Sequence, residues 1–121
     1  MGAKQFDYYI FIDYSESLLG YLIIERNKVL SYLLKNKIRK ANDTPEIYSD
    51  ILEFLKEHNN CFIFISVDNK QYSNFERLVK IIDGVNTKVV RESELRKDTF
   101  EYRISLVLDT LLNIERLKHE K

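Results

Sequence analysis

The feature that most constrains the fold of this chain is residues 61–67, a run in which only Ser66 is polar. The run has the length of one strand. Because it does not alternate apolar and polar residues, it is expected to be buried on both faces of a sheet. Helical periodicity precedes it at residues 44–58 and follows it at residues 71–82. A buried strand between two helices predicts an α/β fold in which helices cover the faces of a sheet.

Three further strands are predicted before this unit and one after it. Residues 6–12, 19–25 and 29–34 are rich in aromatic and aliphatic residues, and short polar connections join them into an antiparallel meander. Residues 87–90 form the last predicted strand. The element order is therefore β-β-β-α-β-α-β-α, which predicts a five-stranded mixed sheet in one domain spanning residues 1–121. In this topology the first and fourth strands are parallel neighbours.

The helices have recognisable ends and faces. Thr44 is expected to be the N-cap of the first helix, with Pro45 at its first helical position. The last helix is predicted at residues 96–118. Its apolar residues share one face and are Phe100, Ile104, Val107, Leu111 and Ile114. Several acidic residues, among them Asp50 and Asp109, are expected to be solvated.

The composition excludes several classes of protein. The hydrophobic fraction of 45% and the charged fraction of 31% are typical of a globular domain, and no apolar run approaches the roughly 18 residues of a membrane span. The single cysteine, Cys61, rules out an internal disulfide and a cysteine-based zinc site. No secretory signal is visible, so a cytoplasmic location is expected. The 19 basic and 19 acidic residues balance, so nucleic-acid contacts would depend on local basic stretches such as residues 36–40.

Four carboxylates fall where this topology is expected to bring chain segments together. Asp13 follows the first strand, Glu46 opens the first helix, Asp68 follows the fourth strand and Asp98 opens the last helix. Clustered carboxylates repel one another, and a divalent cation such as Mg²⁺ can neutralise them through oxygen ligands. Each acid alone also has a structural explanation, as a solvated strand end, a partner of a helix dipole or a turn former. Their joint placement favours a metal site.

Several motifs resemble those of the ribonuclease H type 1 family. Residues 42–47 (Asn-Asp-Thr-Pro-Glu-Ile) and 65–69 (Ile-Ser-Val-Asp-Asn) are similar to the family pattern in which an Asn precedes a helix-opening Glu by four residues and the next strand ends in Ser-x-Asp-Ser. Residues 13–15 (Asp-Tyr-Ser), followed by Gly20, resemble the family's Asp-Gly-Ser strand end and Gly-rich second strand. Residues 89–98 resemble the closing motif of a branch that includes archaeal forms.

This resemblance, which extends over residues 9–112, implies a metal-dependent endonuclease that hydrolyses the RNA strand of RNA–DNA hybrids with two Mg²⁺ or Mn²⁺ ions. It assigns catalysis and metal binding to Asp13, Glu46, Asp68 and Asp98. One ion would activate the attacking water and the other would stabilise the leaving oxygen. Nucleic acid is the expected partner, and the expected substrate contacts are Tyr14, Ser15, Asn42, Asn69, Arg39, Lys40, Arg91 and Arg96.

The chain also departs from the family pattern. Tyr14 replaces the Gly after the first acid, Glu94 replaces the Asn of the closing motif, and the segment before the last acid contains no His. Two alternatives therefore stay open. One is a non-catalytic module of the same fold that binds nucleic acid or protein. The other is a junction-resolving nuclease in which Asp98 and Glu101 form an acid pair. The sequence leaves the oligomeric state open.

Overall fold

The computed structural model describes residues 6–15, 18–26, 35–40, 44–58 and 60–119. Within these residues, five strands and three α-helices follow one another in the predicted order, with a short 3-10 helix, η3, before the last helix. The elements are β1 (Tyr8–Ser15), β2 (Leu18–Glu25), β3 (Lys35–Lys40), α1 (Thr44–Glu57), β4 (Cys61–Ser66), α2 (Asn69–Asp83), β5 (Lys88–Arg91), η3 (Glu92–Glu94) and α3 (Phe100–His119). No helix within the described residues is long and apolar enough to cross a membrane.

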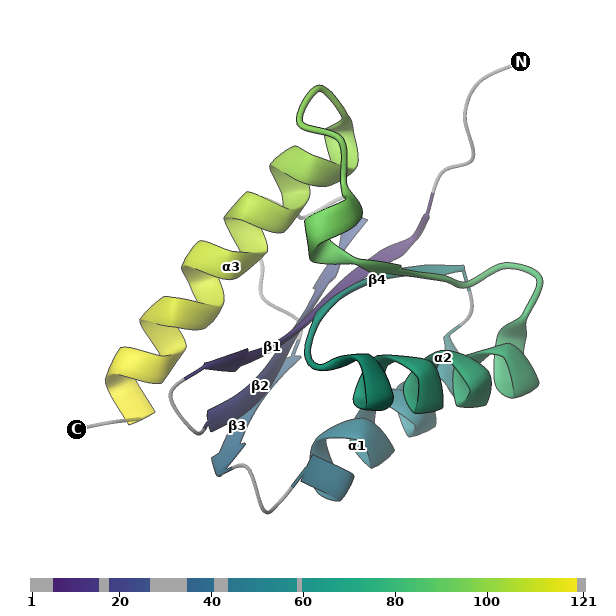
Figure 1. Ribbon diagram of the computed structural model, residues 1–121, viewed down its shortest axis with the longest axis horizontal. Coiled ribbons are helices and arrows are strands. Elements are labelled where there is room, and N and C mark those ends of the chain that lie inside the picture. The colour runs from purple at the N-terminus through teal and green to yellow at the C-terminus, as the bar shows by residue number, and fades with distance from the viewer. Residues whose placement is uncertain (1–5, 16–17, 27–34, 41–43, 59, 120–121) are drawn as a thin grey trace.

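The strands form one mixed sheet in the order β3-β2-β1-β4-β5 (Figure 1). β1, β2 and β3 are an antiparallel meander, whereas β4 runs parallel to β1 and β5 runs parallel to β4. In the β1–β4 register, Ile12 lies opposite Ile65 and Asp13 lies opposite Ser66. The predicted α/β architecture is therefore confirmed. Its five-stranded mixed sheet and element order are those of a ribonuclease H-like fold, with β1 and β4 as the expected parallel neighbours.

The sheet separates two hydrophobic cores. Ile10 and Ile12 belong to the core that packs against α1 and α2, whereas Tyr9 and Phe11 belong to the core that packs against α3. Figure 1 shows the corresponding layers, with α1 and α2 together on one side and α3 on the other. Because successive side chains of a strand point to opposite faces, Asp13 shares the α3 face with Tyr9 and Phe11.

Gly20 allows α3 to approach the sheet closely. A Cβ atom on Gly20 would lie 3.2 Å from Leu112 Cδ1, 3.1 Å from Ile38 Cγ1 and 3.3 Å from the Lys37 carbonyl oxygen. These separations are tighter than ordinary van der Waals contact, so a larger residue would push α3 away from β2. Gly20 also pairs with Asp13 in the β1–β2 ladder. The close approach therefore holds the last turns of α3 beside Asp13.

One predicted strand lies outside the described residues, and the predicted end of another needs correction. The strand predicted at residues 29–34 lies outside them, and the observed β3 is the following segment, Lys35–Lys40, which contains the predicted basic stretch. The first strand was predicted to stop before Asp13, but β1 continues to Ser15 because Tyr14 and Ser15 still pair with β2. Asp13 is thus an internal residue of β1.

The last helix differs from the prediction in its start and in its buried face. α3 begins at Phe100 and not at residue 96. Its buried apolar residues are Ile104, Leu108 and Leu112, whereas the predicted face residues Phe100 and Ile114 are nearly half exposed. α3 is therefore rotated about its axis relative to the predicted orientation. The sheet covers only part of the predicted apolar face. Arg116 extends the buried row by one more turn.

Candidate functional site

Asp13 forms a buried ion pair with Arg116. The Arg116 Nη1 atom lies 3.0 Å from Asp13 Oδ2, and Arg116 Nη2 donates to the Asp13 carbonyl oxygen at 2.8 Å. The side chains of Arg116 and Asp13 are 7% and 15% exposed. Nη1 also donates to Asn113 Oδ1 at 2.9 Å, which orients the guanidinium along α3. A charge-assisted contact of this kind, removed from solvent, holds the carboxylate in one position.

Two more acidic residues, Glu92 and Asp109, interact electrostatically with Asp13. Burial raises the pKa of Asp13, while Arg116 and the Ser66 side chain oppose the rise and the charge of Asp109 adds to it. Burial also raises the pKa of Glu92, and the charges of Asp109 and Asp13 add to that shift. Asp13, Glu92, Asp109 and Arg116, which we call the Arg116 cluster, therefore interact at the carboxyl-terminal edge of the sheet on the α3 side.

Asp68 is the N-cap of α2. Its Oδ1 atom accepts from the Gln71 backbone N–H at 2.8 Å, and its Oδ2 atom accepts from Gln71 Nε2 at 2.9 Å. These hydrogen bonds lower the pKa of Asp68. Tyr48 of α1 donates to Gln71 Oε1 at 2.7 Å, and burial, together with the charge of Asp68, raises the pKa of Tyr48 to about 12. Both oxygens of Asp68 thus contribute to the start of α2.

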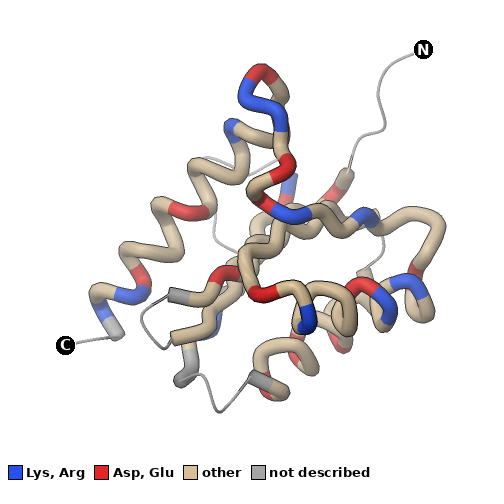
Figure 2. Tube along the Cα trace, in the orientation of Figure 1, with Lys and Arg blue, Asp and Glu red and all other residues tan. Residues whose placement is uncertain are grey.

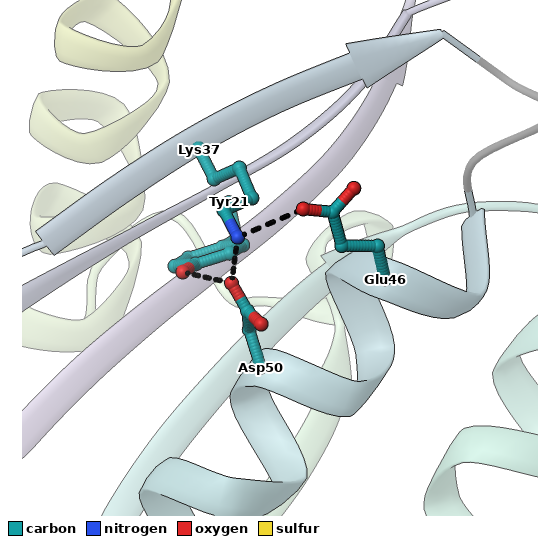
Figure 3. Close-up of polar contacts among 4 residues, drawn as sticks. All are labelled: Tyr21, Lys37, Glu46 and Asp50. Atoms are coloured by element: carbon teal, nitrogen blue, oxygen red, sulfur yellow. Dashed lines mark hydrogen bonds and ion pairs between the residues drawn. The ribbon is translucent and has the colours of Figure 1, made fainter.

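Glu46 participates in a polar cluster between β3 and α1 (Figure 3). Lys37 Nζ lies 3.1 Å from Glu46 Oε1 and 2.5 Å from Asp50 Oδ2, and the Tyr21 hydroxyl donates to the same Asp50 oxygen at 3.0 Å. The two carboxylates raise the pKa of Lys37. The expectation that Asp50 is simply solvated is therefore wrong. Glu46 and Asp50 join β3 to α1 through Lys37.

Asp98 lies in the loop before α3, where it is exposed and pairs with Arg96 at 3.4 Å. Figure 2 shows this charged loop at the opposite end of α3 from the C-terminus. At 1.5 Å per residue, the helix axis from Phe100 to Arg116 is about 24 Å long. Asp98 is therefore far from the Arg116 cluster.

The structure does not bring the four predicted acids together. Asp13 faces α3, Glu46 and Asp68 lie on the side of α1 and α2, and Asp98 is at the start of α3. Among the residues that the structure describes, no three His, Cys, Asp or Glu side chains are grouped so that they could hold a metal ion. As placed, these carboxylates do not fit the two Mg²⁺ ions that the resemblance implies, because their oxygens contact Arg116, Lys37, Gln71 and Arg96 instead.

The residues predicted to contact the substrate are also spread over several separate elements. Tyr14 is exposed at the end of β1. The Asn69 side chain accepts a hydrogen bond from Arg91, whose guanidinium carbon lies 4.3 Å from the centre of the Tyr72 ring. Arg96 is exposed. Asn42 lies outside the described residues, and the side chains of Ser15, Arg39 and Lys40 are not described.

Sequence reasoning missed Arg116 and Glu92, and it expected Asp109 to be solvated, whereas Asp109 is half-buried and its charge acts on Asp13. A signal for Arg116 was present, because residues 104, 108, 112 and 116 recur every four positions along one side of a helix. An arginine that continues a buried row needs an acidic partner, and Asp13 was already a candidate. Glu92 and Asp109 had no comparable local signal, since only the packing of α3 brings them near Asp13.

Comparisons with known proteins find similarity to solved structures only. No protein-family model and no curated protein matches this chain. Among solved structures, a Fowlpox virus resolvase determined with its substrate Holliday junction DNA is similar at a TM-score of 0.42 and 13% sequence identity. The match covers 79% of this chain and 67% of the resolvase chain. At this level of similarity the resolvase has no bearing on the activity of this chain.

Proposed function

We propose that this chain is a ribonuclease H-like module that binds nucleic acid without cutting it. The observation that carries the proposal is the ion pair between Asp13 and Arg116. Arg116 contacts both a side-chain oxygen and the backbone carbonyl of Asp13. Arg116 therefore supplies the positive charge that balances the buried carboxylate of Asp13. The other three predicted acids serve as a helix cap or as ion-pair partners elsewhere in the fold.

A groove beside β5 supports nucleic acid as the ligand. It has a volume of about 420 Å³, and Tyr72, Lys88 and Arg96 are among the residues that line it. Arg91 stacks on the Tyr72 ring at one side. Single-stranded nucleic acids bind grooves that combine aromatic rings with basic side chains. Glu94 and Glu101 also line this groove and balance the charges of Lys88 and Arg96, so the stacking surface of Tyr72 is the main support.

The test measures binding and cleavage on the same labelled substrates. Wild-type protein is titrated against single-stranded DNA, single-stranded RNA, an RNA–DNA hybrid and a four-way DNA junction by fluorescence anisotropy, and each mixture is then incubated with Mg²⁺ or Mn²⁺. We expect salt-dependent binding and intact strands. The Lys88→Ala/Arg96→Ala variant should lower the salt slope by roughly two, one for each lost phosphate contact. Lys56→Ala, on α1, is the matched control. Absence of binding to all four substrates would contradict the proposal.

Metal-dependent cleavage of the hybrid is a second candidate. It is favoured by the confirmed pairing of β1 with β4, which places Asp13 beside the strand that ends just before Asp68. Arg116 would have to leave Asp13 for this function. Metal-dependent cleavage by wild-type protein that is lost in Asp13→Asn would establish it. Cutting of the junction rather than the hybrid would indicate the resolvase alternative.

A further inference from the structure

Arg91, the last residue of β5, is held over the ring of Tyr72. Its guanidinium carbon lies 4.3 Å from the centre of that ring. Arg91 Nη1 donates a hydrogen bond to Asn69 Oδ1, and Arg91 Nε lies 3.8 Å from Glu94 Oε1. Tyr72 and Asn69 belong to α2, and Glu94 belongs to η3. Because two separate elements hold this guanidinium in place, the side chain loses little freedom when a ligand binds.

The contacts of Arg91 leave part of its guanidinium open to a ligand. The Tyr72 ring lies on one side of the guanidinium, yet the Arg91 side chain remains 34% exposed. Arg91 Nη2 donates to no residue that the structure describes. Unpaired bases stack on arginine guanidinium planes in protein–RNA complexes, and free N–H donors of arginine bind phosphate oxygens. Arg91 therefore offers a preorganised surface for one base.

The charges around Arg91 favour recognition of a base over recognition of phosphate alone. The groove beside β5 is lined by two basic and two acidic side chains, which are Lys88, Arg96, Glu94 and Glu101. Glu94 is also the ion-pair partner of Arg91. This edge of the molecule therefore carries little excess positive charge, and phosphate contacts by themselves would give weak binding. Stacking does not require an excess of charge, so it is the interaction that selects the ligand.

We propose that an unpaired nucleobase stacks on the guanidinium of Arg91, so that the ligand is single-stranded nucleic acid. This inference rests on the proposed function and names the class of nucleic acid that the site takes. In a duplex, neighbouring base pairs cover both faces of each internal base, so no face is free for Arg91. A single strand exposes these faces, and the groove lined by Tyr72 lies beside Arg91 to take the neighbouring nucleotides.

Two single-stranded oligonucleotides of equal length test the stacking. One carries bases, and the other carries abasic sugars in their place, so that both have the same phosphates. In fluorescence anisotropy titrations, the wild type should bind the intact strand about tenfold more tightly than the abasic strand. Arg91→Lys keeps the positive charge but lacks the guanidinium plane. The ratio of the two affinities should therefore fall to about twofold or less in this variant.

Arg77→Lys is the matched control, because Arg77 is an exposed arginine of α2 that does not line the groove, and it should keep the preference of the wild type. Circular dichroism of both variants checks that the fold is retained. Equal binding of intact and abasic strands by the wild type, or tighter binding of a duplex of the same sequence, would overturn the inference and leave the proposed function standing. Retention of the full preference by Arg91→Lys would also overturn the inference. Absence of binding to every nucleic acid would overturn both.

Discussion

Arg116 illustrates how one residue determines the chemistry of its surroundings. Asp13 is held away from solvent on the α3 face of β1, where a lone carboxylate would be costly. Arg116 compensates that charge from an element 103 residues away in the chain. Glu92 and Asp109 form no ion pair of their own with any residue in the part of the chain that the structure describes. Substitutions at these residues should therefore have opposite effects on stability.

Removal of Arg116 should strongly destabilise the fold. Arg116→Met leaves the buried Asp13 carboxylate unpaired, and loss of one partner of a buried ion pair costs about 3–5 kcal/mol. Urea denaturation measures this change. Asp13→Asn/Arg116→Met should recover much of the loss, because neither charge remains. Lys118→Met, on the same helix, is the control and should be nearly neutral. A loss below about 1 kcal/mol for Arg116→Met would contradict a structural role for the pair.

Removal of the Glu92 charge should stabilise the fold at neutral pH. The pKa of Glu92 is raised above its ordinary 4.5 by burial and by Asp109 and Asp13. The folded state then binds the proton more readily than the unfolded state, so the unfavourable charge acts above the folded pKa and disappears below 4.5. Glu92→Gln should therefore raise the free energy of unfolding at pH 7 and lose this advantage below about pH 4. Ser93→Ala is the control. A gain independent of pH would point to another cause.

At the scale of elements, Asp68 determines where α2 begins. Its carboxylate accepts hydrogen bonds from the backbone and the side chain of Gln71, so the first turn of α2 depends on it. Asparagine can make the same backbone contact, whereas alanine cannot. The two substitutions at this position therefore separate its capping role from a role that needs negative charge.

Asp68→Ala should lower the free energy of unfolding, and Asp68→Asn should lower it less. The pKa of Asp68 lies below its ordinary 3.8, so its charge contributes stability above that value, and the contribution is lost as the pH falls through the folded pKa. The difference between the wild type and Asp68→Asn should therefore shrink below about pH 3. Chemical denaturation at several pH values measures it. Equal losses for both variants at pH 7 would argue against capping.

At the scale of the whole molecule, Gly20 sets how closely α3 packs on the sheet. A Cβ atom at this position would lie 3.2 Å from Leu112 Cδ1 and 3.1 Å from Ile38 Cγ1. Gly20→Val should therefore lower the free energy of unfolding by about 1–3 kcal/mol, because the larger side chain forces α3 away from β2. Gly20→Ala should cost less, and Tyr14→Val, at an exposed position of β1, is the control. Urea denaturation measures these changes, and an unchanged stability of Gly20→Val would contradict the close packing.

The sequence by itself determined the order of the elements and the interior position of β4 in the sheet. Residues 61–67 are apolar throughout, and such a strand is stable only where both its faces and both its edges are covered. That requirement, together with the helices on either side of it, predicted the parallel pairing with β1. The sequence did not predict β3 at Lys35–Lys40, because this basic edge strand has little apolar pattern of its own.

Only the tertiary structure decided which charged side chains meet. The apolar residues of α3 span a wide arc, and helical periodicity does not show which part of that arc faces the sheet. The close approach at Gly20 and the contact of Arg116 with Asp13 select a rotation that buries Ile104, Leu108 and Leu112. This rotation places Asp109 near Asp13 and leaves Phe100 and Ile114 exposed. Side-chain contacts between distant segments depend on such rotations, and local sequence patterns do not encode them.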